Sequence, residues 1–457
     1  MAKNKKRYHH RPPAQNNPTR KPIRISQCMI VKNEEKNIKQ ALSWAKPIAY
    51  EQIVVDTGST DKTVGIAESM GAKVYHFEWV NDFSAAKNFA IEQAKGDWIA
   101  FLDADEYFPE DSVKRLMLIL RKVEDDPKLR KMKTAIRCQI VNVDDEGKPF
   151  MLLKQDRIFR NTPEIRYLGA VHETLIVEED IMQAPELSII HTGYKQSVYA
   201  ETDKAGRNVE MIRDELSRDP NNMTLKCYLA DSLRVAGPTQ DIPTAEALYR
   251  EVVTSGQPVL NELKQGAYNY LIATYFDDEE KNEEVYEMSR SAYEEFPENP
   301  DFCYYYGRRL YLRGNHRLAW EKLVECEVQL DKDIVEVGSY IPRNPMLLFF
   351  TMVLVAEELG NLQDIIRCAT LVLKEDKYQH MMLAPYIQAF NRPGYKTSAE
   401  DIFELLERLY DFNNLKDKLT VLQAAKTSAN LDLTNRVLAT FTAEELEWIR
   451  SDSGAAN

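Results

Sequence analysis

The sequence lacks the signatures of several large classes of protein. Neither G-x-x-x-x-G-K-[ST] nor G-x-G-x-x-G occurs, which disfavours a P-loop NTPase and a dinucleotide-binding enzyme built on that glycine pattern. The longest largely apolar run, Met346 to Ala356, is too short to cross a lipid bilayer. No apolar stretch follows the polar and basic first residues, so no secretory signal is visible. We therefore expect a cytoplasmic protein without a transmembrane segment.

Cysteine is scarce and follows no pattern. The cysteines are scattered singly among apolar neighbours, and no C-x-x-C spacing occurs. Disulfide frameworks and zinc sites both need clustered or regularly spaced cysteines. We therefore expect buried thiols at all six positions, which are Cys28, Cys138, Cys227, Cys303, Cys326 and Cys368.

Charge is distributed unevenly along the chain. The formal net charge is −13, yet residues 1–24 hold eight Lys or Arg and no acidic residue. A basic terminus of this kind can contact nucleic acid or anionic lipid, but a polar, proline-containing one is more often disordered. We expect residues 1–22 to form a disordered basic tail. The acidic remainder argues against a nucleic-acid enzyme, which needs basic surface to meet phosphates.

Residues 23–200 alternate short apolar strands with helical stretches. This alternation predicts a mainly parallel sheet covered by helices. Helices are expected at 34–45 and 61–70, the second closed by Gly71. The expected strands are 25–31, 52–56, 73–77, 98–103, 135–143, 156–159 and 187–191.

Residues 201–457 show helical periodicity alone, and the length of 457 residues suits two domains. Helices are expected at 225–236, 245–254, 263–275, 285–296, 302–313 and 318–330. Proline and glycine recur between them, which predicts a solenoid of helical hairpins. The stretch from Tyr304 to Trp320, with Gly307 and Gly314, resembles a tetratricopeptide repeat.

Two predicted strands run directly into acidic residues. One ends at Asp56, and the other leads into Asp103 and Asp105. Ligands bind beyond the carboxyl ends of strands in open α/β sheets, so these side chains are expected to share one crevice. Two carboxylates as close as Asp103 and Asp105 repel each other unless a cation lies between them. We therefore predict a Mg²⁺ or Mn²⁺ site, with Asp105 as the direct ligand and Asp103 nearer a ribose.

An ordered set of motifs carries a family resemblance over residues 23–195. The motifs are Met29-Ile30-Val31-Lys32-Asn33-Glu34, Val55-Asp56-Thr57-Gly58-Ser59-Thr60-Asp61, Asp82-Phe83-Ser84-Ala85-Ala86-Lys87-Asn88 and Phe101-Leu102-Asp103-Ala104-Asp105-Glu106. They resemble glycosyltransferase family 2, whose fold is GT-A, an α/β Rossmann-like architecture. The chain is similar to the branch that carries a tetratricopeptide-like region after the catalytic domain. That branch includes lipopolysaccharide core glucosyltransferases and bacteriocin S-glycosyltransferases.

The resemblance implies a nucleotide-sugar donor, with UDP-sugar favoured, a divalent metal, and inversion at the anomeric carbon. It places Asn33, Glu34, Asp56, Lys87, Asp103, Arg157 and Arg160 at the donor and Asp103, Asp105 and His191 at the metal. Arg157 and Arg160 fit an anionic acceptor or an ordinary charged surface equally well. Lys87 is expected to contact the diphosphate; the family more often has Arg here, and Lys keeps the positive charge but loses the bidentate fork. Glu173 is the leading candidate for the general base, and His172 is the alternative.

Two other functions compete with this interpretation. A nucleotidyl transferase also uses paired carboxylates, but it would need a third carboxylate and a basic surface. An interaction protein would use the helical repeats and keep an inactive glycosyltransferase-like domain. In the enzyme, we expect the helical part to recruit a peptide, saccharide or lipid acceptor or to form a homodimer. Aromatic residues between 268 and 311 that look exposed motivate that expectation, although helix packing explains such aromatic stripes better than a ligand cage does.

Overall fold

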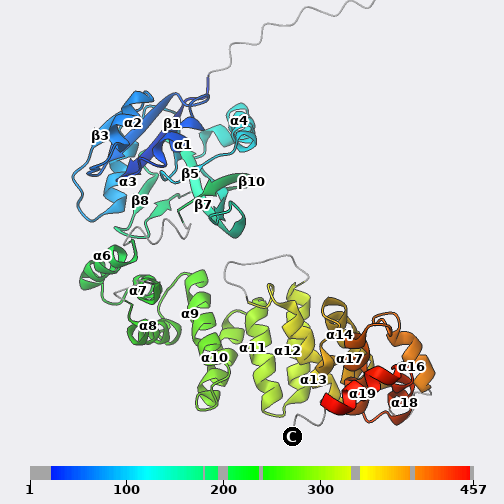
Figure 1. The fold of residues 1–457 in the computed structure, drawn as a ribbon. Helices are drawn as coiled ribbons and strands as arrows, with labels where there is room; N and C mark the ends of the chain where they lie inside the picture. The colour runs from blue at the N-terminus through cyan, green and yellow to red at the C-terminus, as the bar shows by residue number, and fades with distance from the viewer. Residues whose placement is uncertain are drawn as a thin grey trace, which may run out of the picture. The chain divides into compact units, whose positions relative to one another are not determined.

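The computed structural model describes residues 22–178, 181–193, 204–235, 240–330, 340–391 and 397–452. The chain forms two compact units (Figure 1). The first comprises Met1–Asn221 with Asp231–Ile242, and the second comprises Asn222–Ala230 with Pro243–Asn457. The basic tail predicted for residues 1–22 lies outside the described residues except for its last one.

An eight-stranded sheet forms the centre of the first unit, in the order β3-β2-β1-β4-β7-β6-β10-β5. Strands β3, β2, β1 and β4 run parallel, as do β6 and β10, whereas β7 and β5 are antiparallel to their neighbours. The predicted α/β fold with a mainly parallel sheet is confirmed. The strands are β1 Ile25–Val31, β2 Glu51–Asp56, β3 Lys73–His76, β4 Trp98–Phe101, β5 Glu106–Tyr107, β6 Ala135–Val143, β7 Pro149–Arg160 and β10 Met182–His191.

Helices cover both faces of this sheet. All four residues of β4 are buried, as expected of a strand packed on both sides. Trp98 and Ala100 face the cluster that contains Leu120 of helix α4, whereas Ile99 and Phe101 face the cluster that contains Ala90 of α3. The alternation follows from the two-residue period of a strand. The helices of this unit are α1 Ile38–Ser43, α2 Thr63–Ser69, α3 Phe83–Glu92, α4 Glu110–Asp125 and α6 Lys204–Arg218.

Several elements differ from the sequence prediction. Helix α1 starts at Ile38 rather than 34, because Asn33 has a positive φ of 57° and begins a loop. Strand β7 is longer than the predicted 156–159, since its first half forms a hairpin with β6. A second, two-stranded sheet of β8 (Arg166–Leu168) and β9 (Thr174–Ile176) was not predicted. Neither was α4.

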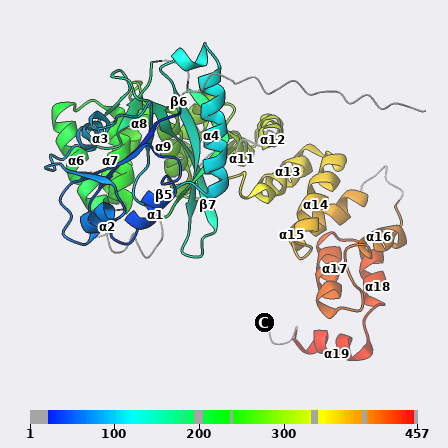
Figure 2. The ribbon, with the colours of Figure 1, turned by 90° about the horizontal axis from the view of Figure 1, so that it is seen from above.

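The second unit consists of packed helices, as predicted for a helical-hairpin repeat. Figure 2 shows helices α13 to α18 following one another along the chain. Gly307 explains one close approach, because a Cβ there would lie 3.0 Å from the Leu323 side chain. The helices after α6 are α7 Met223–Val235, α8 Ile242–Thr254, α9 Asn261–Thr274, α10 Asn282–Glu295, α11 Pro300–Leu312, α12 His316–Leu330, α13 Pro345–Leu359, α14 Leu362–Glu375, α15 His380–Phe390, α16 Ala399–Leu406, α17 Leu415–Thr427, α18 Leu431–Leu438 and α19 Ala443–Asp452.

The aromatic residues between 268 and 311 are packed inside this unit. Tyr268, Phe302 and Tyr305 are buried, and Tyr268 meets Phe302 edge to face. The expectation that this aromatic content is exposed is wrong for these buried rings, whereas Tyr270 and Tyr286 are half-buried. The six cysteines, all within the described residues, are likewise buried and form no disulfide bond, as predicted. Among the described helices, none is both long enough and apolar enough to span a membrane.

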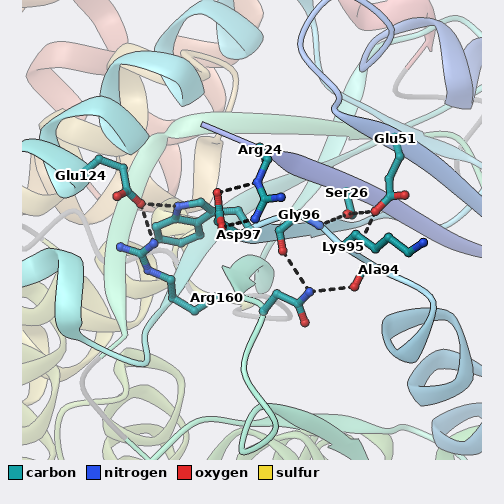
Figure 3. Close-up of polar contacts among 11 residues, drawn as sticks. Arg24, Ser26, Glu51, Ala94, Lys95, Gly96, Asp97, Glu124 and Arg160 are labelled. Carbon is teal, nitrogen blue, oxygen red and sulfur yellow. Dashed lines mark hydrogen bonds and ion pairs between the residues drawn. The ribbon is translucent and has the colours of Figure 1, made fainter. Parts of the chain in front are cut away.

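A dense polar network lies at the edge of the sheet where the parallel strands begin (Figure 3). The Glu51 carboxylate accepts hydrogen bonds from Ser26 Oγ at 2.7 Å and from the Lys95 N–H at 2.5 Å. The Gly96 N–H donates to the same Ser26 hydroxyl at 2.8 Å. These hydrogen bonds join β1 to β2 and attach the loop before β4 to both strands.

Gly96→Ala is expected to destabilise the protein by about 1–3 kcal/mol. A Cβ at this position would lie 2.7 Å from the Ser26 nitrogen and 2.9 Å from the Arg24 carbonyl oxygen, so backbone must move. Gly65→Ala is the matched control, since Gly65 lies in α2 and a Cβ added there would have no neighbour within 4 Å. That control is expected to stabilise by about 0.5–1 kcal/mol. Urea unfolding measures both, and equal stabilities of the two variants would contradict the argument.

Candidate active site

The acidic residues predicted to share a crevice lie at the same edge of the sheet. Strand β1 separates β2 from β4, and all three run parallel. The register pairs Val31 with Asp56, and Cys28 with Phe101, the last residue of β4. The turn that carries Asp103 and Asp105 follows directly. Parallel pairing thus brings the carboxyl ends of β2 and β4 to one side of the sheet.

Asp56 organises the turn that follows β2. Its carboxylate accepts hydrogen bonds from the N–H groups of Gly58 at 3.2 Å and Ser59 at 3.1 Å. Asn33 supports the same turn, because its Oδ1 accepts from the Thr60 N–H at 2.8 Å. The Glu34 N–H donates to Thr63 Oγ1 at 2.7 Å. Asn33 and Glu34 therefore join the loop after β1 to the loop after β2.

Asp103 lies between two buried cationic side chains. Its carboxylate is 3.3 Å from Lys87 Nζ and accepts a hydrogen bond of 2.8 Å from Arg157 Nη2. The sequence argument required a metal ion to offset repulsion between Asp103 and Asp105. The structure shows that Lys87 and Arg157 already compensate the Asp103 charge, so that argument for a metal was too strong.

Glu106 is a site residue that the sequence analysis quoted in a motif but did not single out. Its Oε1 accepts from Arg157 Nη2 at 2.5 Å, and its Oε2 accepts from the Asp103 N–H at 3.0 Å. Glu106 therefore closes the Asp103–Glu106 turn from inside. The acidic residue one position after the Asp-x-Asp pattern was the available signal.

Burial and charge act in opposite directions on these carboxylates. Burial opposes ionisation of Asp103, but the charges of Lys87 and Arg157 outweigh it and hold the Asp103 pKa well below its usual range. Burial dominates at Glu106 and raises its pKa, although Arg157 works against the shift. Burial likewise opposes the charge on Lys87, yet Asp103 and Glu173 outweigh it and raise the Lys87 pKa.

Asp105 faces His191, the last residue of β10. Asp105 Oδ2 lies 3.4 Å from His191 Nε2. The other ring nitrogen, Nδ1, lies 2.6 Å from Oδ1 of the buried Asn142, whose Nδ2 donates to the Met151 carbonyl at 3.3 Å. Because Nδ2 serves Met151, Asn142 presents its oxygen to the ring and Nδ1 carries the hydrogen. His191 Nε2 is thereby directed at Asp105.

Gly193 closes over this pair. A Cβ on Gly193 would lie 2.1 Å from Asp105 Oδ2 and 2.7 Å from His191 Nε2, so any larger residue would displace one of these side chains. Asn142 was not identified from the sequence, whereas Gly193 was noted there beside the strand-end His191. Asn142 meets His191 because β6 and β10 pair in parallel with these two residues in register.

Glu173 lies in the turn before β9 and contacts Lys87. Its Oε1 is 2.6 Å from Lys87 Nζ, so Lys87 bridges Glu173 and Asp103. His172 is exposed and has a positive φ of 53°, a conformation that costs a non-glycine residue energy. The Lys87 ammonium group therefore connects Glu173, the predicted base, to Asp103, which is predicted to bind the donor.

Arg160 is not brought to this cluster. It pairs with Trp98 at the start of β4, and its Nη1 donates to Glu124 at 2.5 Å (Figure 3). Arg157 lies three residues away, roughly 10 Å along a strand, beyond the Ala100–Ile158 pair and toward Asp103. The antiparallel register of β7 thus sends the two arginines to opposite edges of the sheet.

The arrangement suits a shared metal site better than one made by the protein alone. Among the residues that the structure describes, no three His, Cys, Asp or Glu side chains are arranged to hold a metal ion. Asp105 and His191 supply an oxygen and a nitrogen, which leaves further positions for ligand or water oxygens. Magnesium commonly binds in this way, through one or two protein groups together with phosphate oxygens.

Arg157→Met is expected to cost about 3–5 kcal/mol of stability near neutral pH, because it leaves the buried Glu106 unpaired. Burial raises the Glu106 pKa already, and the variant binds that proton still more tightly when folded than when unfolded. Its stability therefore falls as pH rises, so the loss is expected to be larger at about pH 8 than at about pH 5.5.

The matched control is Arg137→Met, which removes a half-exposed pair with Asp156 on neighbouring strands. That change is expected to cost about 1 kcal/mol or less. Denaturant unfolding at the two pH values measures both variants. If the stability that Arg157→Met loses is the same at both pH values, the argument that a buried, charged Glu106 is left unpaired is contradicted.

Comparison with known proteins places residues 26–127 in the family described as glycosyl transferase family 2. A TPR repeat-containing protein of Synechococcus elongatus is 30% identical over 246 residues, which cover 51% of this chain and 57% of the relative. The SPbeta prophage-derived glycosyltransferase SunS of Bacillus subtilis is 29% identical over 199 residues, or 42% of this chain and 45% of the relative. The chain thus spans about half the length of these curated relatives.

A solved structure of S. aureus TarS in complex with UDP-GlcNAc is 16% identical, with a TM-score of 0.34. The match covers 55% of this chain and 87% of that one. The family match spans β1 to β4 and the turn through Glu106, and so includes Asp56, Asp103 and Asp105. The first unit of the chain therefore carries a glycosyltransferase family 2 domain, which is followed by a helical, tetratricopeptide-like region.

Proposed function

We propose that this protein is an inverting, metal-dependent glycosyltransferase that uses a nucleotide-sugar, with UDP-sugar favoured. The acceptor is a peptide or protein, or a glycan or lipid, which the helical unit recruits. The single observation that carries the proposal is that Asp56, Asp103 and Asp105 lie at the same edge of the sheet. Lys87 joins Asp103 to Glu173 there. A donor-binding turn, a candidate metal pair and a candidate base all meet there.

The donor set at Asp105 and His191 fits Mg²⁺ or Mn²⁺. Asn142 fixes the His191 ring so that Nε2 and the Asp105 carboxylate face each other, as ligands of one cation would. When bound, such a cation neutralises the charge that develops on the departing diphosphate. Asp103 precedes Asp105 by two residues. Its side chain is 37% exposed, so it can accept hydrogen bonds from the donor's ribose.

Glu173 acts as the general base in this proposal. The acceptor atom forms a bond to the anomeric carbon while the bond from that carbon to the diphosphate oxygen breaks. The bonding electrons leave on the diphosphate, and the acceptor proton passes to the Glu173 carboxylate. Attack from the face opposite the leaving group inverts the anomeric centre. Arg157 is assigned a supporting part, because its Nη2 contacts both Asp103 and Glu106.

Asp105→Asn is expected to abolish Mn²⁺-dependent binding of UDP, because it removes the charged oxygen that faces His191. Calorimetry with UDP, with and without Mn²⁺, measures this, and excess chelator should have the same effect on the wild type. Asp111→Asn, at an exposed position of α4, is the matched control and should bind UDP normally. Wild-type protein that binds no UDP with Mn²⁺ would favour the interaction protein with an inactive domain.

Glu173→Gln is expected to lower turnover by about 10²–10⁴-fold while UDP binding persists. The slow release of UDP from a UDP-sugar, with water as acceptor, measures turnover without knowledge of the natural acceptor. Glu110→Gln, an exposed change on α4, serves as the control. Normal turnover in Glu173→Gln would remove Glu173 from the mechanism and leave His172→Ala as the next variant to measure.

A further inference from the structure

Lys87 is the most deeply enclosed cation beside the candidate base. Only 4% of the residue is exposed, and its Nζ lies 2.6 Å from Glu173 Oε1 and 3.3 Å from Asp103 Oδ1. The ammonium also lies over the rings of Phe101, at 5.3 Å, and Tyr167, at 5.0 Å. Two carboxylates and two aromatic faces therefore surround it, and each of them favours a positive charge at this point.

Helix α3, which carries Lys87, is joined to the backbone of the segment that leads to Glu173. Its first turn donates twice, from the Phe83 N–H to the Ala170 carbonyl at 2.8 Å and from Ser84 Oγ to the Gly169 carbonyl at 2.5 Å. Asn88 then binds both backbone polar groups of Tyr167. Its Nδ2 donates to the Tyr167 carbonyl and its Oδ1 accepts from the Tyr167 N–H, each at 2.9 Å.

These contacts give the residues of the Asp82–Asn88 motif separate structural tasks. Asp82 begins α3 by accepting from the Ala85 N–H at 2.9 Å. The next residues bind the backbone of the segment before Glu173, and Lys87 binds its carboxylate. The motif thus forms a clamp, which we define as residues 82–88 of α3 together with residues 167–173.

We propose that Lys87 and the 82–88/167–173 clamp position Glu173 against the acceptor, in place of the diphosphate contact expected from the sequence. The inference rests on the proposed function and deepens it. Lys87 is a positioning residue, because it contacts the candidate base rather than the reacting atoms. Through Asp103 the same ammonium also connects the base to the donor side of the site.

Two features argue against a diphosphate role for Lys87. Its charge is already shared by two carboxylates, so a diphosphate would have to displace one of them. Burial beneath Tyr167 and Phe101 also leaves the ammonium little surface to offer a ligand. Asp103 keeps its second cation, Arg157, at 2.8 Å, so the donor side remains held when Lys87 is removed.

Lys87→Met tests the proposal, because methionine is unbranched and packs well against aromatic rings while lacking the charge. Turnover of a UDP-sugar with water is expected to fall about 10²-fold, and the KM for the donor and the affinity for UDP with Mn²⁺ should change little. Lys87→Arg keeps the positive charge and is expected to recover at least about a tenth of the wild-type rate. Lys95→Met, at an exposed position after α3, is the matched control.

Asn88→Ala tests the clamp without touching the ammonium. It removes the hydrogen bonds to the N–H and the carbonyl of Tyr167. We expect turnover to fall while donor affinity is preserved, as in Lys87→Met. Circular dichroism and thermal unfolding confirm that each variant is folded before its kinetics are compared.

The outcomes separate this inference from the proposed function. Wild-type protein that binds UDP with Mn²⁺ and hydrolyses a UDP-sugar supports the function. If Lys87→Met then loses UDP affinity by about tenfold or more with kcat unchanged, Lys87 is a diphosphate ligand and the positioning role is wrong. If Lys87→Met lowers kcat while Asn88→Ala has normal kcat, the clamp does not position Glu173. The charge of Lys87 then acts alone.

Discussion

Two buried cations hold the carboxylates of this site in place. Lys87 and Arg157 are both almost fully enclosed, and between them they contact Asp103, Glu106 and Glu173. A carboxylate in a low-dielectric interior stays charged only when an opposite charge compensates the lost hydration. Without these cations the acids would repel one another or take up protons. The geometry of the site therefore depends on side chains that do not themselves perform the chemistry.

The location of the acidic residues could be predicted from the sequence. An apolar strand that runs into Asp56, and another that runs into Asp103 and Asp105, place these residues at the carboxyl edge of a parallel sheet by local pattern alone. His191 came instead from the family resemblance, supported by its place at the end of a later strand. The tetratricopeptide-like region was also readable, because helical periodicity and recurrent turn residues are local properties.

The contacts that refine the site could not be predicted, because they depend on strand register. Asn142 meets His191 through the parallel pairing of β6 and β10, and nothing near Asn142 in the sequence shows it. Arg157 and Arg160 look equivalent in the sequence, yet the register of β7 on β4 sends them to opposite edges. The aromatic residues of α11 misled for a related reason, since periodicity cannot tell a face covered by the next helix from an exposed one.

The two edges of the sheet differ in how far their charges are balanced. Where the strands begin, Glu51 is matched by Lys73 and by donors from Ser26 and Lys95. Where they end, Lys87 and Arg157 contact Asp103, Glu106 and Glu173, while Asp56 and Asp105 lie beside the imidazole rings of His76 and His191. In the proposed function, this excess of negative charge would attract a divalent cation and, with it, the phosphates of the donor. The first edge is built for stability, whereas the unbalanced edge gains most from a bound ion.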